Sequence, residues 1–570
     1  MSRENEDESS TSPPAQAVTE TPPPARIPRD FQRTGFVRPP DKFSAAVFVL
    51  FFAAVMLLQF RSGAYMCMVG GDSDEPSHYV TGLMVRDYIA SGMTAPPMEY
   101  AENYYLHYPK VGLGQWPPFF YVIQAAWTLL FSPSRLSVML LMAVIGALLV
   151  TTTCSVIRRE FSAAFGVAAG FFMLSLPLIQ HQTEAIMADL LVALLVFLAA
   201  LSFGRYLDSE RWQDSVWFGI WASLALLTKG SAIVLAIIPP LSLLLSRRWR
   251  LALRWSFWLS ALVVLVVCSP WYLLVPGARH ETVTPYGGLG FKEPRLLLAP
   301  LHLYAQGIVP LLLAAHGLFE AVRWRLGPGN GRWVAALSLL LGLIFLPAVM
   351  SVAAEERYLI SGVSVLLMFM AISLAWLTAR LSGRLKSAVA ILPAVACFAY
   401  SVHQVVPGVC RGYGELAQVL LSKPELRDSV MLVSSDPVGE GVLVAEVAVR
   451  ENRPGHIVLR ASKLLASVSW MGGSYQLLFH TPAEVMQQLE RIPISILVMD
   501  RSPTNQFSHN RLLWEVLRAY PGRWERIGFA GPNEGSGKML EAYRLRGSEG
   551  RPRATIRLDL RRSLGRYIER

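Results

Sequence analysis

Residues 43–60 read FSAAVFVLFFAAVMLLQF, a run without one charged side chain. Such length and apolarity are typical of a helix that crosses a bilayer. Further apolar runs follow, and we predict spans at residues 43–60, 135–156, 163–180, 188–204, 214–227, 231–246, 253–270, 298–318, 333–352, 359–378 and 386–404. The predicted fold is therefore an α-helical polytopic membrane protein with about 11 spans, and up to 13 if shorter apolar segments also cross.

The composition excludes the main soluble classes of protein. Of the 570 residues, 53% are hydrophobic and only 16% are charged, and the mean hydropathy is +0.38. A chain this apolar is not expected to be a soluble enzyme, a nucleic-acid-binding protein or a disordered scaffold. The net charge of +11 is better explained by basic residues at the cytoplasmic ends of spans. The five cysteines include no CxxC pair, and Cys154, Cys268 and Cys397 lie in apolar runs, as inert core residues do.

Basic clusters predict which side of the membrane each connection faces. They occur at alternate connections, at Arg158/Arg159, Arg247/Arg248/Arg250, Arg323/Arg325 and Arg380/Arg384/Lys386. Because such clusters stay in the cytoplasm, the loop 61–134 and everything after residue 405 should face outward. This alternation requires residues 117–131 to form an interfacial or half-inserted helix. We predict a multi-pass protein of the cell inner (plasma) membrane whose active site and C-terminal domain are extracytoplasmic.

Composition also divides the chain into four parts. Residues 1–42 are rich in proline, serine and charge and should form a disordered cytoplasmic tail. Residues 43–405 form the transmembrane domain. Residues 406–550 alternate β-rich runs such as Ile494–Met499 with helical patterns such as Pro482–Ile492, which predicts a soluble α/β domain. An arginine-rich tail, 551–570, either binds anionic lipid or is simply solvated.

An acidic run lies in the first outward loop. Asp72, Asp74 and Glu75 fall within four residues, just beyond the first span. Such carboxylates could act as a general base, hold a divalent cation, or form only an acidic solvated turn. The following residues, Tyr79–Ala90, have the spacing of an amphipathic helix that lies on the interface.

Other polar residues are predicted to gather on the same face. His107, Lys110 and Trp116 follow in the same loop, and Lys110 could bind a phosphate or snorkel at an aromatic belt. Glu184 and Asp189 open a span, Lys229 lies at the turn between two short spans, and Arg357 and Tyr358 open another span. Because charges at a membrane boundary are costly, a polar cavity explains them better than chance does.

These motifs resemble those of integral-membrane glycosyltransferases of the GT-C superfamily. Over about residues 44–380, the chain is similar to bacterial relatives of protein O-mannosyltransferases and of the lipid A aminoarabinose transferase. The resemblance rests on Asp74-Glu75, His107–Lys110, Trp116–Pro118, Asp189, Thr228-Lys229-Gly230 and Arg357-Tyr358. Two features depart from the family pattern, namely the additional Asp72 and a C-terminal α/β domain that matches no known acceptor-binding pattern.

The resemblance implies transfer of a hexosyl or pentosyl unit from a polyprenyl-phosphate (or polyprenyl-diphosphate) carrier to an extracytoplasmic acceptor hydroxyl of a lipid, glycan or protein. Asp74 would be the general base, and Glu75 would orient either Asp74 or the acceptor. A single base without a second, nucleophilic carboxylate would give inversion at the anomeric carbon. Lys110, Lys229 and Arg357 would bind the donor phosphate. The acceptor or the shape of the site would involve Asp72, His78, Tyr79, His107, Trp116, Glu184, Asp189 and Tyr358. Asp72, Asp74 and Asp189 are candidate metal ligands, the metal itself is left open, and no nucleotide cofactor is expected.

Two functions of other classes compete with this interpretation. A transporter or flippase of a lipid-linked or polar solute would place ionisable residues near the midplane of the membrane, whereas here they gather at one face. A sensor whose outward domain binds a ligand would not need eleven spans as an anchor. The expected partners are therefore a polyprenyl-phosphate sugar, an outward acceptor and membrane lipids, with no nucleic acid.

Overall fold

The computed structural model describes most of the chain between residues 41 and 569. The described residues are 41–68, 71–275, 307–349 except 325, 327 and 328, 356–467 except 428, 475–530 except 504, 539–548, 557–560 and 566–569. The predicted tail 1–42, apart from its last two residues, and most of the basic tail 551–570 lie outside them.

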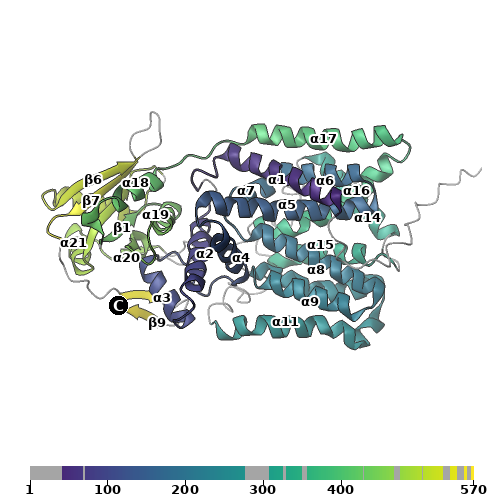
Figure 1. Ribbon diagram of the computed structural model, residues 1–570, viewed down its shortest axis with the longest axis horizontal. Helices are drawn as coiled ribbons and strands as arrows, with labels where there is room; N and C mark the ends of the chain where they lie inside the picture. Colours follow the sequence, from purple (N-terminus) through teal and green to yellow (C-terminus); the bar gives the residue numbers. More distant parts are fainter. Residues whose placement is uncertain are drawn as a thin grey trace, which may run out of the picture. The chain divides into compact units, whose positions relative to one another are not determined.

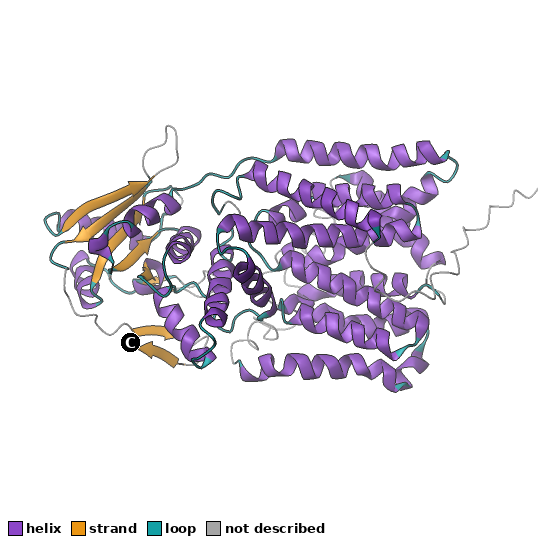
Figure 2. Ribbon diagram, in the orientation of Figure 1, coloured by secondary structure: helices purple, strands orange, loops and turns teal. Residues whose placement is uncertain are grey.

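Long apolar helices dominate the part of the chain before residue 405 (Figures 1 and 2). Six described helices are long and apolar enough to cross a membrane: α1 (Lys42–Ser62), α5 (Arg135–Glu160), α8 (Asp189–Ser209), α11 (Trp255–Leu274), the η4–α16 pair (Glu356–Leu377) and α17 (Gly383–Gln404). A bent pair, α6 (Ala163–Ser175) and α7 (Pro177–Thr183), makes a seventh if both helices belong to one span. Shorter apolar helices occupy Phe119–Leu130, Gly230–Ser246 and Gly331–Leu346. The predicted class, a helical multi-pass membrane protein, is confirmed, and the count of eleven spans stays a prediction.

Prolines interrupt two of the predicted spans. The span predicted at 163–180 is not one straight helix, because α6 and α7 meet at Pro177 with a bend of 74°. Proline has no N–H to donate and its ring clashes with the preceding turn, so a helix bends or ends there. The span predicted at 231–246 begins as the 3₁₀ helix η2 (Gly230–Ile237), and α10 (Ile238–Ser246) starts with prolines in its first turn.

The remaining described helices of this part lie in the bundle and in the segment between α1 and α5. They are α2 (Glu75–Ala90), α3 (Pro97–His107), α4 (Phe119–Leu130), α9 (Trp212–Leu226), η3 (Trp249–Leu253), α14 (Ile308–Trp324) and α15 (Gly331–Val349). Helix α8 is the most enclosed of the long helices, with 83% of its apolar stretch buried against α5, α9 and α15. Only 17% of the apolar stretch of α11 is buried, so this helix offers its leucine, valine and tryptophan side chains to lipid.

Polar caps fix where the long helices begin and end. The Ser134 hydroxyl accepts a hydrogen bond from the Ser137 N–H at the start of α5, and Arg158 and Arg159 lie in its last turn. Helix α1 starts at the Asp41 carboxylate and ends at Gly63, whose φ of 78° closes the helix in a left-handed conformation. These are the residue types that satisfy free N–H groups at a helix start and free carbonyls at its end.

Residues after 412 form an α/β fold. The sheet has the strand order β2-β1-β5-β7-β6, with β1 (Val430–Ser434), β2 (Ile457–Arg460), β5 (Ile494–Asp500), β6 (Trp524–Ala530) and β7 (Leu540–Leu545). Strands β2, β1 and β5 are parallel, whereas β7 is antiparallel to β5 and β6. The helices are α18 (Tyr413–Leu421), α19 (Pro437–Arg450), α20 (Ala461–Leu464), α21 (Pro482–Arg491) and α22 (Ser508–Ala519), and short strands pair as β3 (Ala466–Ser467) with β4 (Gln476–Leu477) and β8 (Arg557–Leu560) with β9 (Arg566–Glu569). These strands support the predicted α/β domain.

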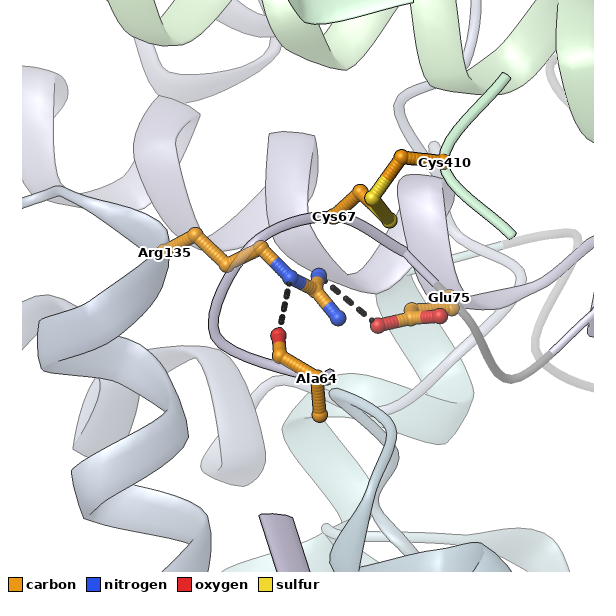
Figure 3. Close-up of a disulfide and its surroundings, with 5 residues drawn as sticks. All are labelled: Ala64, Cys67, Glu75, Arg135 and Cys410. Atoms are coloured by element: carbon orange, nitrogen blue, oxygen red, sulfur yellow. Dashed lines mark hydrogen bonds and ion pairs between the residues drawn. A yellow bond between two sulfur atoms is a disulfide. The ribbon is translucent and has the colours of Figure 1, made fainter. Parts of the chain in front are cut away.

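A disulfide joins the loop that follows α1 to the segment that follows α17. Cys67, just after α1, is bonded to Cys410, just after α17, across 343 residues of sequence (Figure 3). Close by, the Gly408 N–H donates to the Ser62 carbonyl at 2.9 Å. This bond was not predicted, because a sequence shows which cysteines exist but not which of them pair. Cys154 and Cys268 are buried free thiols, as expected.

The C-terminal domain docks on the segment 75–114 through polar contacts. Helix α19 packs along α2. The Arg453 guanidinium binds the Asp87 carboxylate with Nε and Oδ2 2.6 Å apart. The Tyr108 hydroxyl donates to Glu451 Oε1 at 2.6 Å. Tyr108 and Arg453 are mostly buried, so these contacts make the docking specific.

Candidate active site

The start of helix α2 separates the three carboxylates of the acidic run. Asp74 is the residue before the helix, and Glu75 and Pro76 form its first turn. The first nine residues of α2, Glu75–Leu83, are all buried. The helix predicted at Tyr79–Ala90 is present but begins earlier, at Glu75, and it contacts α4 and α19; its interfacial position stays a prediction.

One arginine holds two of these carboxylates. Arg357, in the 3₁₀ helix η4 (Glu356–Gly362), bonds Asp72 Oδ2 through Nη1 and Asp74 Oδ2 through Nη2, both at 2.8 Å. The guanidinium is 11% exposed, so the charges interact with little screening by water. Burial opposes ionisation of Asp74, but the charge and the hydrogen bond of Arg357, together with the charge of Lys110, outweigh it and hold the pKa of Asp74 below its ordinary value. Asp74 is therefore a carboxylate at neutral pH.

Glu75 points into the protein, away from this pair. Its carboxylate is 1% exposed and bonds Arg135 Nη1 at 2.9 Å (Figure 3). The Ile186 N–H donates to the same Glu75 oxygen at 3.3 Å. Arg135 in turn donates through Nε to the Ala64 carbonyl at 2.6 Å. Glu75 thus ties α2 to the start of α5 and to the loop after α1, and this geometry favours a structural role over contact with substrate.

A second ion pair joins α8 to the turn after α9. Lys229 Nζ lies 2.7 Å from Asp189 Oδ1, and Asp189 is 1% exposed at the first position of α8. The ammonium also lies 4.9 Å from the centre of the Tyr358 ring, within the range of a cation–π contact. Since Tyr358 follows Arg357 in η4, both ion pairs meet the same short 3₁₀ helix.

His78 feels the charges of both ion pairs. Its Nδ1 is 2.7 Å from the Tyr121 hydroxyl, and its ring packs on Trp116 with centroids 4.4 Å apart. Burial lowers the pKa of His78 to about 4, although the carboxylates of Asp74 and Asp189 act to raise it. His78 is therefore a neutral imidazole in this site.

Lys110 is buried against Gly441 of the C-terminal domain. Its side chain is 8% exposed, and its loop is fixed by the Gly112 N–H, which donates to Thr81 Oγ1 of α2 at 2.9 Å. Burial and, next, Arg460 lower the pKa of Lys110 to about 7, although Asp74 and Glu440 oppose this shift. A bound phosphate would favour the protonated form, so such a lysine can respond to an anion.

The tryptophan–proline segment is anchored beside Lys229. The first N–H of α4, from Phe119, donates to the Leu227 carbonyl at 2.8 Å. This bond brings Trp116–Pro118 next to the turn that carries Lys229. The sequence predicts these motifs on one face. In the structure, the contacts above bring together Asp72, Asp74, His78, Trp116, Asp189, Lys229, Arg357 and Tyr358.

Two further predicted site residues, Tyr79 and His107, have partners of other kinds, and a third, Glu184, has its pKa changed by burial. The Tyr79 hydroxyl donates to the Pro133 carbonyl at 2.6 Å, and burial raises the pKa of this phenol. His107 Nδ1 lies 2.8 Å from the Gly455 carbonyl, so His107 helps to dock the C-terminal domain. Burial raises the pKa of Glu184 to about 7, which makes it a carboxyl group that can exchange a proton at neutral pH.

Among the residues that the structure describes, no group of three histidine, cysteine, aspartate or glutamate side chains is placed to hold a metal ion. Asp72 and Asp74 both bind Arg357, and Asp189 binds Lys229. Each of the three candidate metal ligands therefore already has a basic partner in this structure.

Sequence reasoning missed the residues that support this site. Arg135 neutralises Glu75, and Tyr121 orients His78. Both lie in apolar helical runs whose pattern indicates only a membrane-spanning or interfacial segment. A lone arginine at the outer end of a span was the one available signal for Arg135.

The fold and part of the sequence match known glycosyltransferases. Residues 115–273 match the family model described as dolichyl-phosphate-mannose-protein mannosyltransferase. ArnT from Cupriavidus metallidurans, bound to undecaprenyl phosphate, is similar with a TM-score of 0.56 and 15% identity, over 89% of this chain and 99% of that one. The same ArnT in the apo state gives 0.58 and 16%, over 89% of this chain and 100% of that one.

A third structure belongs to a much larger protein. The arabinofuranosyltransferase AftD from Mycobacteria is similar with a TM-score of 0.53 and 14% identity, over 87% of this chain and 40% of that one. No curated protein matches the chain in sequence. The resemblance to GT-C glycosyltransferases related to ArnT and to protein mannosyltransferases is confirmed, and at these identities the structural likeness establishes the fold.

Proposed function

We propose that the chain is a membrane glycosyltransferase that moves a sugar from a polyprenyl-phosphate carrier to a hydroxyl of an extracytoplasmic acceptor. The observation that carries this proposal is the ionised Asp74, held by Arg357 in a fold shared with such enzymes. Two comparisons support the donor class: the matched family model is named for a polyprenyl-phosphate sugar, and one similar structure holds undecaprenyl phosphate.

In this proposal Asp74 removes the proton from the acceptor hydroxyl. In the geometry seen, Arg357 binds Asp74 and weakens it as a base. A donor phosphate would attract Arg357, and any loosening of the Arg357–Asp74 bond would raise the basicity of Asp74. Donor binding would thus prepare the base for the acceptor. A single base, without a second carboxylate acting as nucleophile, gives inversion at the anomeric carbon.

The phosphate would be bound by three cations from distant parts of the chain. Arg357 and Lys229 already have carboxylate partners, which hold them in place before the donor arrives. Among the described residues, the Lys110 ammonium makes no side-chain hydrogen bond or ion pair, so it is the cation most available to a phosphate oxygen. Negative charge that develops on the departing phosphate would be stabilised by these groups.

The disulfide supports an outward-facing site. Disulfides persist in oxidising compartments, and Cys67 and Cys410 flank the segments that carry Asp74 and the C-terminal domain. We therefore expect a reporter fused to the N-terminus of the full-length chain to lie in the cytoplasm and one fused to the C-terminus to lie outside. Both reporters on one side of the membrane would contradict this topology.

A lipid and glycan profile tests the function itself. Cells that lack the protein should accumulate one polyprenyl-phosphate sugar and lose one extracytoplasmic glycosylated product, because donor and product are the two ends of the same reaction. Mass spectrometry of extracted lipids and glycans measures both, and the wild-type chain supplied in trans should restore the pattern. An unchanged pool of polyprenyl-linked sugars, together with loss of uptake or export of a solute, would favour a transporter instead.

A further inference from the structure

The strongest unexplained feature near the site is a glycine of the C-terminal domain that touches the candidate phosphate lysine. Gly441 lies in helix α19, which packs along α2. A Cβ atom at this position would lie 2.7 Å from Lys110 Cε and 3.1 Å from Pro76 Cγ. Carbon atoms in van der Waals contact are about 3.5–4.0 Å apart, so a side chain here would have to displace at least one of these neighbours.

The backbone does not require glycine at this position. Gly441 lies inside a helix and is not among the residues with positive φ, so alanine could adopt the same backbone conformation. Glycine inside a helix is less favourable than alanine. The close approach of Lys110 and Pro76 is therefore the structural reason for the missing side chain.

The first turn of α19, against which Lys110 packs, is held in place by hydrogen bonds. The N–H of Gly439 donates to Asp436 Oδ1 at 2.7 Å, which caps the start of α19. Glu440, which is fully buried, accepts from Arg460 Nε at 3.0 Å and from the Ser462 N–H at 2.8 Å. These bonds fix the first turn of α19 to β2 and α20, so Gly441 cannot easily yield to Lys110.

Gly441 also faces the start of α2, which follows the candidate base Asp74. Pro76 belongs to the first turn of α2, two residues after Asp74, and the charges of Asp74 and Lys110 act on each other. Gly441 of the C-terminal domain thus lies against both the Lys110 side chain and the helix start that follows Asp74.

We propose that Gly441 is a positioning residue, through which the C-terminal domain places the Lys110 ammonium for the donor phosphate. This inference rests on the proposed function. It assigns to the C-terminal domain a part in donor binding, because α19 forms the surface against which the lysine side chain is held.

The test is a double-mutant cycle on the full-length purified protein, with undecaprenyl phosphate as the probe. The variants are Gly441→Ala, Lys110→Ala and the double variant. Gly522→Ala is the matched control, since Gly522 is in the same domain and a Cβ there would meet nothing within 4 Å. Gly441→Ala should weaken binding about tenfold, which corresponds to the loss of one charge-assisted hydrogen bond. In the Lys110→Ala background the same change should have almost no further effect.

Enzyme kinetics and protein stability separate positioning from a general structural role. Gly441→Ala should raise the KM for the donor more than it lowers kcat, while its thermal stability should match that of Gly522→Ala. If Gly441→Ala lowers the amount of folded protein, Lys110→Ala should restore it, since it removes the crowded Cε atom.

The outcomes distinguish this inference from the proposed function. Normal binding by Gly441→Ala, or equal losses in both backgrounds, would overturn the positioning role and leave the phosphate role of Lys110 intact. Normal binding by Lys110→Ala would remove Lys110 from the phosphate site, and the inference would fail with it.

Discussion

Asp74→Asn should insert and fold normally but transfer sugar at least about a hundredfold more slowly than the wild type. Asparagine keeps the shape of the side chain and removes the basic oxygen, and a general base typically contributes about 10²–10⁴-fold in rate. That factor corresponds to roughly 3–5 kcal/mol of activation free energy. Transfer from a polyprenyl-phosphate sugar, normalised to the amount of protein in the membrane, measures the effect.

Asp72→Asn is the matched control for this prediction. Asp72 binds the same guanidinium as Asp74 at the same 2.8 Å, so both variants disturb Arg357 alike. Only Asp74→Asn removes the proposed base, and Asp72→Asn should therefore cost much less activity. An inactive Asp72→Asn beside a nearly normal Asp74→Asn would show that the wrong carboxylate has been assigned, and two active variants would contradict the mechanism.

Glu75→Ala should destabilise the fold by about 3–5 kcal/mol, the typical result of removing one partner of a buried ion pair. Arg135, whose side chain is only 9% exposed, would keep its charge without the carboxylate that now neutralises it. The Ile186 N–H would also lose its acceptor. The measurements are the amount of folded protein in the membrane and its thermal unfolding in detergent.

The control for Glu75 is the double variant Glu75→Ala/Arg135→Met, which removes both charges. It should recover much of the lost stability, because an apolar pair does not leave a buried charge without a partner. A Glu75→Ala protein that is normally stable and yet inactive would return Glu75 to the catalytic role that the sequence alone suggested, namely orienting the base or the acceptor.

The membrane class and the general position of the site could be predicted from the sequence. The length and apolar composition of the run 43–60 show that it can cross a bilayer, because both depend only on residues that are neighbours in the chain. The strand predicted at Ile494–Met499 matches β5 to within one residue. Asp74, Lys229 and Arg357 were predicted to gather on one face because scarce charges next to apolar runs are conspicuous.

Only the tertiary structure shows which of these charges bind one another. Arg357 reaches Asp72 and Asp74 across more than 280 residues, and Cys67 finds Cys410 across 343. Glu75 is adjacent to Asp74 in sequence, yet the first turn of α2 sends it into the interior toward Arg135. Gly441 has no sequence pattern that connects it with Lys110.

The physical reason is the range of the interactions. Hydropathy, capping and strand alternation arise from residues close together in the chain, so they are present in the sequence itself. The pairing of Arg357 with Asp74, and the contact of Gly441 with Lys110, depend on how helices from distant parts of the chain pack. That packing is decided by the complementary shapes of whole helix faces, and it exists only once the chain has folded.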